Sequence, residues 1–227
     1  MWLDKNQPAR DYLDAVQMPE ARLHFSQFGE DCLIWHYLHE KWDGFYVDVG
    51  AHDPFRYSNT CLLHKFRRWR GINIDADSRA IDRFKTARPH DINIHMGVAA
   101  ASGRRTLALF DDGAVNTFDP NIAARAEQHF GKATEAEIEV APLAELLDRF
   151  LPPQTSVDYL NVDCEWLDEE VVRSNDWVRR RPTIVSVELH GLDLQEPLAN
   201  SCVRFLKEQG YVISAHYFCT TIFERRS

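Results

Sequence analysis

The chain has 227 residues, of which 44% are apolar and 27% are charged, and this composition predicts a single globular domain with a sizeable core. The net charge of −9 argues against nucleic acid as a partner, because binding to phosphate backbones draws on an excess of Lys and Arg. No apolar run approaches the roughly 20 residues of a membrane helix, and residues 1–10 lack the regions of a signal peptide. We therefore expect a cytoplasmic protein with no membrane span.

The N-terminal region differs in character from the rest of the chain. Residues 1–24 are polar and interrupted by prolines, which predicts an N-terminal arm or helix laid over a core of residues 25–227. The polar segment from Gln27 to Asp31 then precedes an apolar pattern with helical spacing, Cys32 to Leu38. This places a helix N-terminus at the polar segment, where the helix dipole explains Glu30 and Asp31 without a further role.

The next two strands carry the most informative pattern of the chain. The continuous apolar run Phe45–Val49 predicts a strand buried on both faces, and Gly50 after it permits a sharp turn and close approach to a ligand. A helix is expected near residues 58–66 and a second strand over residues 72–75. Asp75 lies 27 residues beyond Asp48 (75 − 48), about one βαβ unit, which predicts a nucleoside-type ligand spanning two strand ends.

Strands and helices alternate through the remainder of the chain. We expect further helices over residues 79–86, 121–130, 142–150, from about 167, and 201–209. Further strands are expected over residues 92–96, 106–110, 137–140, 157–163, 183–188, 211–215 and 221–225. The last two strands are too close together for a crossover helix, so they must form an antiparallel hairpin. The pattern predicts an α/β fold whose mostly parallel sheet binds ligands at the carboxyl ends of its strands.

Several motifs occur together in an order that points to a known family. They are Ser26-Gln27-Phe28-Gly29-Glu30-Asp31, Phe45-Tyr46-Val47-Asp48-Val49-Gly50-Ala51-His52, Tyr57-Ser58-Asn59-Thr60, Arg70-Gly71-Ile72-Asn73-Ile74-Asp75 and Asp163-Cys164-Glu165. From about residue 25 to the C-terminus the chain resembles the FkbM-type methyltransferases. The resemblance implies a single domain with the Rossmann-like class I methyltransferase fold. It also implies an S-adenosylmethionine-dependent O-methyltransferase acting on a hydroxyl group of a sugar, glycan or other small natural product.

One position departs from the family pattern and keeps alternatives open. The family usually has glycine after the Asp-x-Glu motif, whereas this chain has Trp166. The indole would fill part of the acceptor pocket, alter specificity, or mark a module that binds the cofactor without turnover. Another nucleotide-dependent enzyme such as a dehydrogenase is the further alternative, although the usual GxGxxG turn is absent and Gly50 stands alone.

The resemblance implies roles for residues at the strand ends. Gly50 and Ala51 would pass under the methionine part of the cofactor, Asp48 would hold its amino end, and Asp75 would bind the ribose hydroxyls. Ala76 would flank the adenine together with Asp77, which could equally cap the next helix. The other expected cofactor contacts are Gln27, Asn59, Thr60, Gly97 and Val98.

Transfer to a hydroxyl group requires that a proton be removed, so a base or a metal ion is expected. The candidates for proton removal are His190, His52, Asp163 and Glu165. Asp163 and Glu188 follow neighbouring strands, so the two carboxylates are also candidate ligands of Mg²⁺. The alternative is that Glu188 and His190 only close their strand through hydrogen bonds.

The cysteines and the basic clusters are assigned no catalytic role. The five cysteines are odd in number and form no CxxC pair, which predicts reduced thiols and argues against a structural zinc site. The basic runs near residues 65–70 and 179–181 precede strands, so they should lie at the edge of the sheet opposite the site. The sequence leaves a homo-oligomer open.

Overall fold

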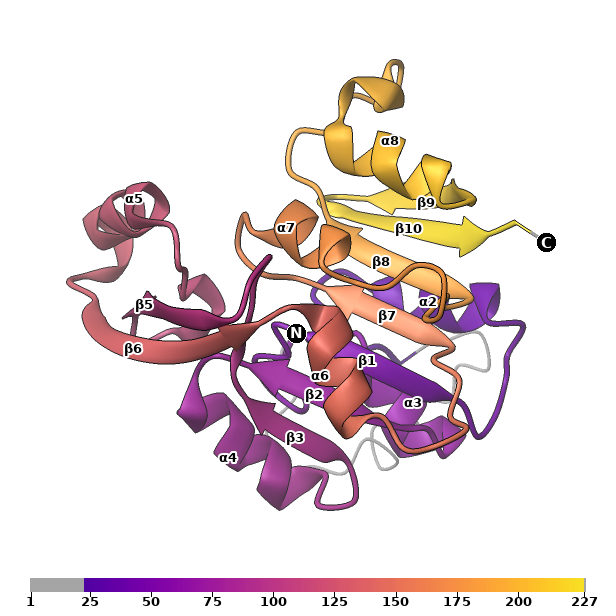
Figure 1. Cartoon of the computed structure of the whole chain (residues 1–227), viewed down its shortest axis with the longest axis horizontal. Helices are drawn as coiled ribbons and strands as arrows, with labels where there is room; N and C mark the ends of the chain where they lie inside the picture. The colour runs from indigo at the N-terminus through magenta and orange to yellow at the C-terminus, as the bar shows by residue number, and fades with distance from the viewer. Residues whose placement is uncertain (1–22, 227) are drawn as a thin grey trace.

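The computed structural model describes residues 23–226, which form a seven-stranded sheet flanked by helices and a smaller three-stranded sheet (Figure 1). The expected N-terminal arm over residues 1–24 falls almost entirely outside the described residues. Among the described helices, none combines the length and apolar character that crossing a membrane requires.

The elements follow the expected alternation of strands and helices. The helices are α2 (Glu30–Tyr37), α3 (Cys61–Arg67), α4 (Ser78–Ala87), α5 (Pro120–Phe130), α6 (Leu143–Phe150), α7 (Asp168–Arg173) and α8 (Ser201–Glu208), with short 3₁₀ turns η1 (Gly113–Val115) and η2 (Pro197–Ala199). The strands are β1 (Phe45–Val49), β2 (Arg70–Asp75), β3 (Ile92–His95), β4 (Gly97–Val98), β5 (Gly103–Leu109), β6 (Thr134–Ala141), β7 (Tyr159–Val162), β8 (Ile184–Glu188), β9 (Tyr211–Tyr217) and β10 (Thr220–Arg225).

The order of the strands in the large sheet is β3-β2-β1-β7-β8-β10-β9. The first five strands pair in parallel, and β10 runs antiparallel to both β8 and β9. The predicted parallel sheet and its closing antiparallel hairpin are therefore confirmed. The order of the strands reverses between β1 and β7, and in open α/β sheets such a switch point leaves a crevice at the carboxyl ends where ligands bind.

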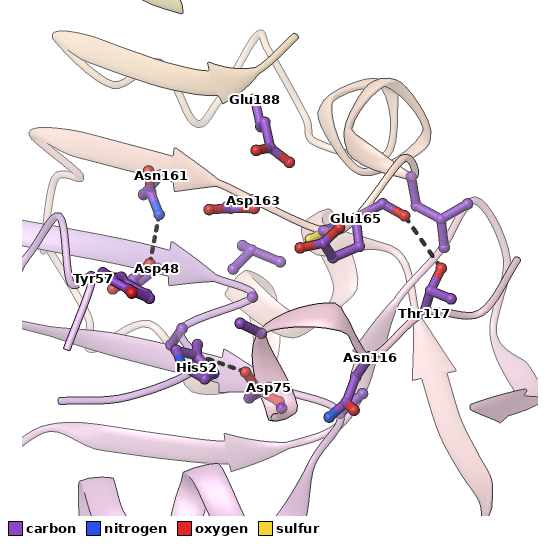
Figure 2. A pocket seen from close by; sticks show the side chains of 18 of the residues that line it. Asp48, His52, Tyr57, Asp75, Asn116, Thr117, Asn161, Asp163, Glu165 and Glu188 are labelled. Atoms are coloured by element: carbon purple, nitrogen blue, oxygen red, sulfur yellow. Dashed lines mark hydrogen bonds between the residues drawn. The ribbon is translucent and has the colours of Figure 1, made fainter. Parts of the chain in front are cut away.

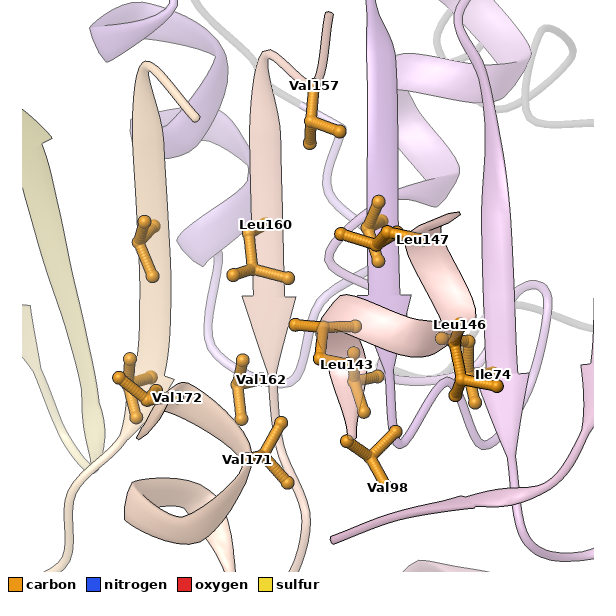
Figure 3. Packing of buried hydrophobic residues seen from close by; sticks show 14 of the residues in the cluster. Ile74, Val98, Leu143, Leu146, Leu147, Val157, Leu160, Val162, Val171 and Val172 are labelled. Atoms are coloured by element: carbon orange, nitrogen blue, oxygen red, sulfur yellow. The ribbon is translucent and has the colours of Figure 1, made fainter. Parts of the chain in front are cut away.

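Each face of the large sheet carries its own apolar core. On one face Leu143, Leu146 and Leu147 of α6, together with residues of α7 and α8, pack against Val162 and other residues of the parallel strands (Figure 3). On the other face α2 and α3 contribute to a second cluster with Tyr46, which is fully buried. Because both faces are covered, the strands read as continuous apolar runs in the sequence.

A row of polar side chains interrupts the second face. Asn93, Asn73, Asp48, Asn161 and Ser186 are register partners on five adjacent strands, β3, β2, β1, β7 and β8. Within this row Ser186 donates a hydrogen bond to Asn161 at 2.6 Å. Since buried polar groups destabilise a fold unless they are hydrogen-bonded, the row constrains how α3 and the loop before it pack on the sheet.

The region between β3 and β7 is elaborated, as expected. Strands β4, β6 and β5 form the three-stranded sheet, and α5 lies beyond it at the far end of this extension (Figure 1). Strand β6 is longer than predicted because it pairs with β5 along most of its length, from Thr134 to Val140. Helix α3 begins at Cys61, three residues later than expected, so residues 58–60 remain in a loop.

Gly50 ends β1 in a conformation that only glycine adopts easily. Its φ angle is +76°, and a Cβ atom added to it would lie 1.7 Å from the carbonyl oxygen of Asp163. The sequence analysis expected Gly50 to allow close approach of a ligand. In the structure, glycine is required because the turn after β1 packs closely on the chain after β7.

Gly50→Ala should therefore lower the free energy of unfolding by at least about 2 kcal/mol, through backbone strain and displacement of the Asp163 carbonyl. Urea denaturation followed by circular dichroism measures this change. Gly103→Ala is the control, because a Cβ atom added at Gly103 would have no neighbouring atom within 4 Å, and it should change stability by less than about 0.5 kcal/mol. Equal effects of the two substitutions would contradict this account of Gly50.

Candidate functional site

A cavity of about 510 Å³ lies at the switch point, where the carboxyl ends of β1, β2, β7 and β8 meet (Figure 2). This volume is in the range of small-molecule sites. Nearly every residue that the sequence analysis proposed for the site lines it: Gln27, Asp48, Gly50, Ala51, His52, Asn59, Asp75, Ala76, Gly97, Val98, Asp163, Glu165, Glu188 and His190. Three residues that the sequence analysis considered for the site are not in the lining: Asp77, Trp166 and Thr60, and Thr60 is fully buried beneath the cavity wall.

Thr60 supports Asp48 instead of facing the cavity. Its Oγ1 donates a hydrogen bond to Asp48 Oδ2 at 2.7 Å, and Asn161 Nδ2 donates to Asp48 Oδ1 at 2.8 Å. Burial raises the pKa of Asp48, while these two hydrogen bonds and the nearby charge of Arg88 act in the opposite direction. Asp48 is thus held in one orientation at the cavity floor, and Thr60 is fully buried because it provides part of that support.

Arg88, at the end of α4, connects this carboxylate to the loop after β1. The side chain is buried, and its guanidinium donates to Thr60 Oγ1 at 2.9 Å and to Ser58 Oγ at 3.0 Å. It also donates to the carbonyl oxygen of Pro54. A single buried cation therefore fixes both ends of the loop that carries Asn59 into the cavity.

Asp75, at the end of β2, is held by the backbone on both sides. Its Oδ2 accepts a hydrogen bond from the N–H of His52 at 2.8 Å, and its Oδ1 accepts one from the N–H of Asp77 at 2.7 Å (Figure 2). Burial outweighs these bonds and raises the pKa of Asp75 to about 6. Asp77 caps α4 by accepting from the N–H of Arg79 at 2.8 Å, so its capping role is confirmed, and it does not line the cavity.

Carboxyl groups gather on the opposite wall, beyond the ends of β7 and β8 (Figure 2). Oxygen atoms of Asp163, Glu165 and Glu188 lie within 4.8 Å of one another. Part of the Asp163 side chain faces the cavity. Its pKa is nevertheless raised well above the usual range, first because the surrounding protein excludes water from the carboxylate and second because of the negative charge of Glu188. Burial, with Glu188 and Asp168 as further causes, raises the pKa of Glu165 to about 8.

The helix α7 begins with three acidic residues, and their contacts go beyond an interaction with the helix dipole. Asp168 is buried, accepts a hydrogen bond from the N–H of Cys164 at 2.8 Å, and has a pKa raised by burial to about 7. Glu169 pairs with Arg173 at 2.8 Å, and Glu170 pairs with Arg105 at 2.5 Å. Asp168 thus shapes the loop that presents Glu165, whereas the other two carboxylates form ion pairs away from the cavity.

Trp166 does not line the cavity, which argues against one of the three alternatives, that its indole fills part of the acceptor pocket. The side chain is 54% exposed, and its ring stacks on the imidazole of His190 with centroids 4.5 Å apart and planes at 24°. Its φ angle is +78°, a left-handed conformation that is unfavourable for tryptophan and easy for the usual glycine. The indole therefore restrains His190 from the outside.

A comparison of the sequence with models of protein families identifies its family. Residues 48–213 match the family model described as the methyltransferase FkbM domain. The chain belongs to the FkbM methyltransferase family. It is accordingly an S-adenosylmethionine-dependent methyltransferase, and its strand order with a closing antiparallel hairpin is that of the class I methyltransferase fold.

A solved structure is also similar to this FkbM-family methyltransferase. It is a precorrin-6y C5,15-methyltransferase from Geobacter metallireducens, with 15% sequence identity, a TM-score of 0.44, and coverage of 94% of this chain and 96% of that one. No curated protein matches the chain in sequence.

The residues present fit S-adenosylmethionine. The cavity is lined by the partly buried carboxylate of Asp75, which is suited to accept hydrogen bonds from ribose hydroxyl groups, and by the buried carboxylate of Asp48, which is suited to a cationic amino group. The Nε2 atom of His52 is shielded from solvent and has no hydrogen-bond partner within residues 23–226, which leaves a polar atom for a ligand to satisfy. Elsewhere in the lining, Gly97 leaves no space for a side chain, since a Cβ atom would lie 2.7 Å from the ring of Phe118.

Several cavity residues of the FkbM-family methyltransferase were missed by the sequence analysis. Asn161 had a usable signal, because it interrupts the buried strand β7 as Asp48 interrupts β1. Phe28 and Phe218 stack at the cavity wall with centroids 4.1 Å apart, although 190 residues separate them (218 − 28). The other lining residues were not among the predicted site residues: Val49, Tyr57, Ser58, Ile74, Met96, Leu107, residues 113–118, Cys164, Leu167 and Cys219.

Thr60→Val should destabilise the protein by about 1–3 kcal/mol, because a buried carboxylate would lose a donor and Arg88 would lose an acceptor. Denaturation in the absence of ligand measures the change. Thr106→Val is the matched control, since the exposed Thr106 hydroxyl donates to Glu137 at 2.6 Å, and its loss should cost less than about 0.5 kcal/mol. A Thr60→Val protein as stable as the control would show that Asp48 does not depend on this hydroxyl.

Proposed function

We propose that this protein is an O-methyltransferase that transfers a methyl group from S-adenosylmethionine to a hydroxyl group of a sugar, glycan or other small natural product. The observation that carries the proposal is the division of the cavity into two walls (Figure 2). One wall, with Asp48 and Asp75, suits a nucleoside with a cationic amino group. The other, with Asp163 and Glu165, suits removal of a proton.

On the first wall, Asp75 accepts hydrogen bonds from the ribose hydroxyl groups and Asp48 receives the amino group of the methionine part. Gly50 and Ala51 pass under that part, and Asn59 and Gln27 contact its carboxylate end. Ala76, Gly97 and Val98 flank the adenine. His52 lies beside Asp75, to which its backbone N–H is bonded, so we assign it to the nucleoside and not to proton transfer.

On the second wall, Glu165 accepts the proton of the acceptor hydroxyl group. A general base works best when its pKa is near the working pH, and the pKa of Glu165 is raised to about 8. The bound S-adenosylmethionine supplies a methyl group already activated by its sulfonium. As Glu165 takes the proton, the oxygen lone pair forms the new bond to carbon, and the carbon–sulfur electron pair remains on sulfur. Positioning of the two reactants supplies most of the acceleration.

A second form of the proposal includes Mg²⁺ bound by Asp163 and Glu188, because hard cations prefer carboxylate oxygens and the two groups lie close together. Activity that is lost with a chelator and restored by Mg²⁺ alone would favour this form.

A module that binds the cofactor without turnover is the competing function, and its main argument was an indole inside the acceptor pocket. Trp166 lies outside the cavity lining, which favours turnover.

The acceptor class is supported by the aromatic side chains at the cavity. Phe218 lines the cavity and is 66% exposed, and exposed apolar surface beside a cavity is typical of a ligand-binding surface. A sugar ring or other small natural product presents both an apolar face to such a ring and hydroxyl groups to Glu165. The cytoplasmic location and a homo-oligomer stay predictions.

Asp75→Ala should weaken the binding of S-adenosylhomocysteine about 10- to 100-fold, because two ribose hydroxyl groups would lose a charged acceptor. Isothermal titration calorimetry measures the affinity. Asp82→Ala is the control: this exposed carboxylate on α4 pairs with Lys85 at 3.0 Å, and its loss should leave the affinity unchanged. An Asp75→Ala protein that binds as tightly as the wild type would remove the ribose assignment.

Glu165→Gln should lower kcat about 10²- to 10⁴-fold and change the affinity for S-adenosylhomocysteine by less than about threefold, since the proton acceptor is lost and the nucleoside wall is untouched. Transfer of a labelled methyl group to a panel of sugars and hydroxylated natural products measures kcat. Glu208→Gln, an exposed change on α8, should have no effect. A product methylated on nitrogen or carbon would contradict O-transfer, and unchanged kcat would contradict the role of Glu165.

A further inference from the structure

Three side chains with different ligand atoms meet at the cavity beside the carboxyl wall. Glu188 ends β8, His190 follows it by two residues, and Cys219 comes from the turn between β9 and β10. A carboxylate oxygen, an imidazole nitrogen and the sulfur of these residues lie within 4.8 Å of one another. All three also line the cavity, so their common centre is open toward a bound ligand.

The backbone fixes the relative position of these residues. Glu188 is the register partner of Thr220 in the antiparallel pair of β8 and β10. The N–H of Leu189 donates to the carbonyl oxygen of Cys219 at 2.6 Å, which ties the turn to the chain after β8. The group is therefore built on paired strands and not on an unsupported loop, as a metal site requires.

One oxygen of the Glu188 carboxylate is buried without a hydrogen-bond partner. This atom, Oε2, is shielded from solvent and makes no hydrogen bond within the described part of the chain. The Nε2 atom of His190 lies only 3.1 Å from it without forming a hydrogen bond. In a tetrahedral zinc site, nitrogen and oxygen ligands about 2.0–2.1 Å from the metal are about 3.3 Å apart, close to the separation found here.

The surroundings favour a cation at this point. Carboxylates of Asp163 and Glu165 stand beside Glu188, and in residues 23–226 no Lys or Arg side chain forms an ion pair with any of the three. The stacked indole of Trp166 restrains the imidazole of His190 from outside the cavity.

We propose that Glu188, His190 and Cys219 bind a transition-metal ion of the zinc type, with one coordination position open toward the cavity. An imidazole and a thiolate select such ions over Mg²⁺, which prefers oxygen ligands only. Three protein ligands and an open position are the arrangement of catalytic zinc sites. A metal ion binds cysteine as the thiolate, so the thiol proton of Cys219 passes to solvent when the ion binds.

The role of the ion rests on the proposed function, whereas its binding does not. Glu165 lines the same cavity as the three ligands, and an acceptor hydroxyl group at the open coordination position of the ion would have a lowered pKa. The hydroxyl proton then passes to the Glu165 carboxylate. Trp166 becomes a positioning residue, since it acts only through the ring of His190.

Cobalt substitution tests the site directly. The full-length protein is stripped of metal with a chelator and titrated with Co²⁺, whose thiolate complexes have a charge-transfer band in the near ultraviolet. One equivalent of Co²⁺ should produce this band, and Cys219→Ser should abolish it and weaken Zn²⁺ binding by about 100-fold or more. Cys32→Ser is the matched control, because Cys32 lies on α2 and does not line the cavity, and it should leave the band unchanged.

A band that survives in Cys219→Ser, or Co²⁺ binding without a thiolate band, would overturn the proposal. So would binding of Mg²⁺ but not Zn²⁺, which would assign the cation to the carboxylates instead. If Cys219→Ser does not fold, X-ray absorption at the zinc edge of the zinc-loaded wild-type protein tests the proposal instead. The spectrum must show one sulfur atom coordinated to zinc. A separate titration with S-adenosylhomocysteine tests the proposed function. Absence of binding would contradict that function and would not change the conclusion on metal binding.

Discussion

The need to satisfy one buried carboxylate, that of Asp48, organises the floor of the cavity. Removing a charge from water is costly unless hydrogen bonds and an opposite charge compensate it. Here Thr60 and Asn161 donate directly, and Arg88 supplies the charge through Thr60. Each of these residues comes from a different element, so the carboxylate fixes the relative positions of β1, β7, the end of α4 and the loop before α3.

The topology of the sheet determines where the functional groups meet. Because the strand order reverses between β1 and β7, the helices after these strands turn to opposite faces and leave the carboxyl ends open. Asp75 is presented on one side of this opening and Asp163 on the other, and Gly50 packs against the backbone of Asp163 between them. The turn after β1 and the chain after β7, which carries the proposed proton acceptor, are thus in direct contact.

The sequence allows the fold and most of the cavity lining to be predicted, because strand ends in a parallel sheet converge whatever the details of packing. It does not show that Thr60 points away from the cavity, since that depends on Arg88, which lies 28 residues later (88 − 60). The pairing of Cys219 with Glu188 and His190 arises from a hairpin register, and no local spacing of ligands records it. Of the three alternatives for Trp166, the structure does not support filling of the acceptor pocket, because the ring stacks on His190 outside the cavity lining. The family's usual glycine at this position agrees with the left-handed backbone, but it does not indicate where an indole placed there would lie.

The charge balance of the cavity bears on turnover as well as on binding. The carboxyl wall of Asp163, Glu165 and Glu188 makes no ion pair with Lys or Arg among the described residues, and burial with acidic neighbours raises the pKa of Asp163 and of Glu165. S-adenosylmethionine carries a positive sulfonium, and its demethylated product does not. On the proposed function, a bound sulfonium near this wall would lower the pKa of its carboxyl groups and so favour the ionised form of Glu165 that accepts a proton. Transfer of the methyl group would remove this positive charge, so the proposed proton acceptor would be ionised most readily while the donor is bound.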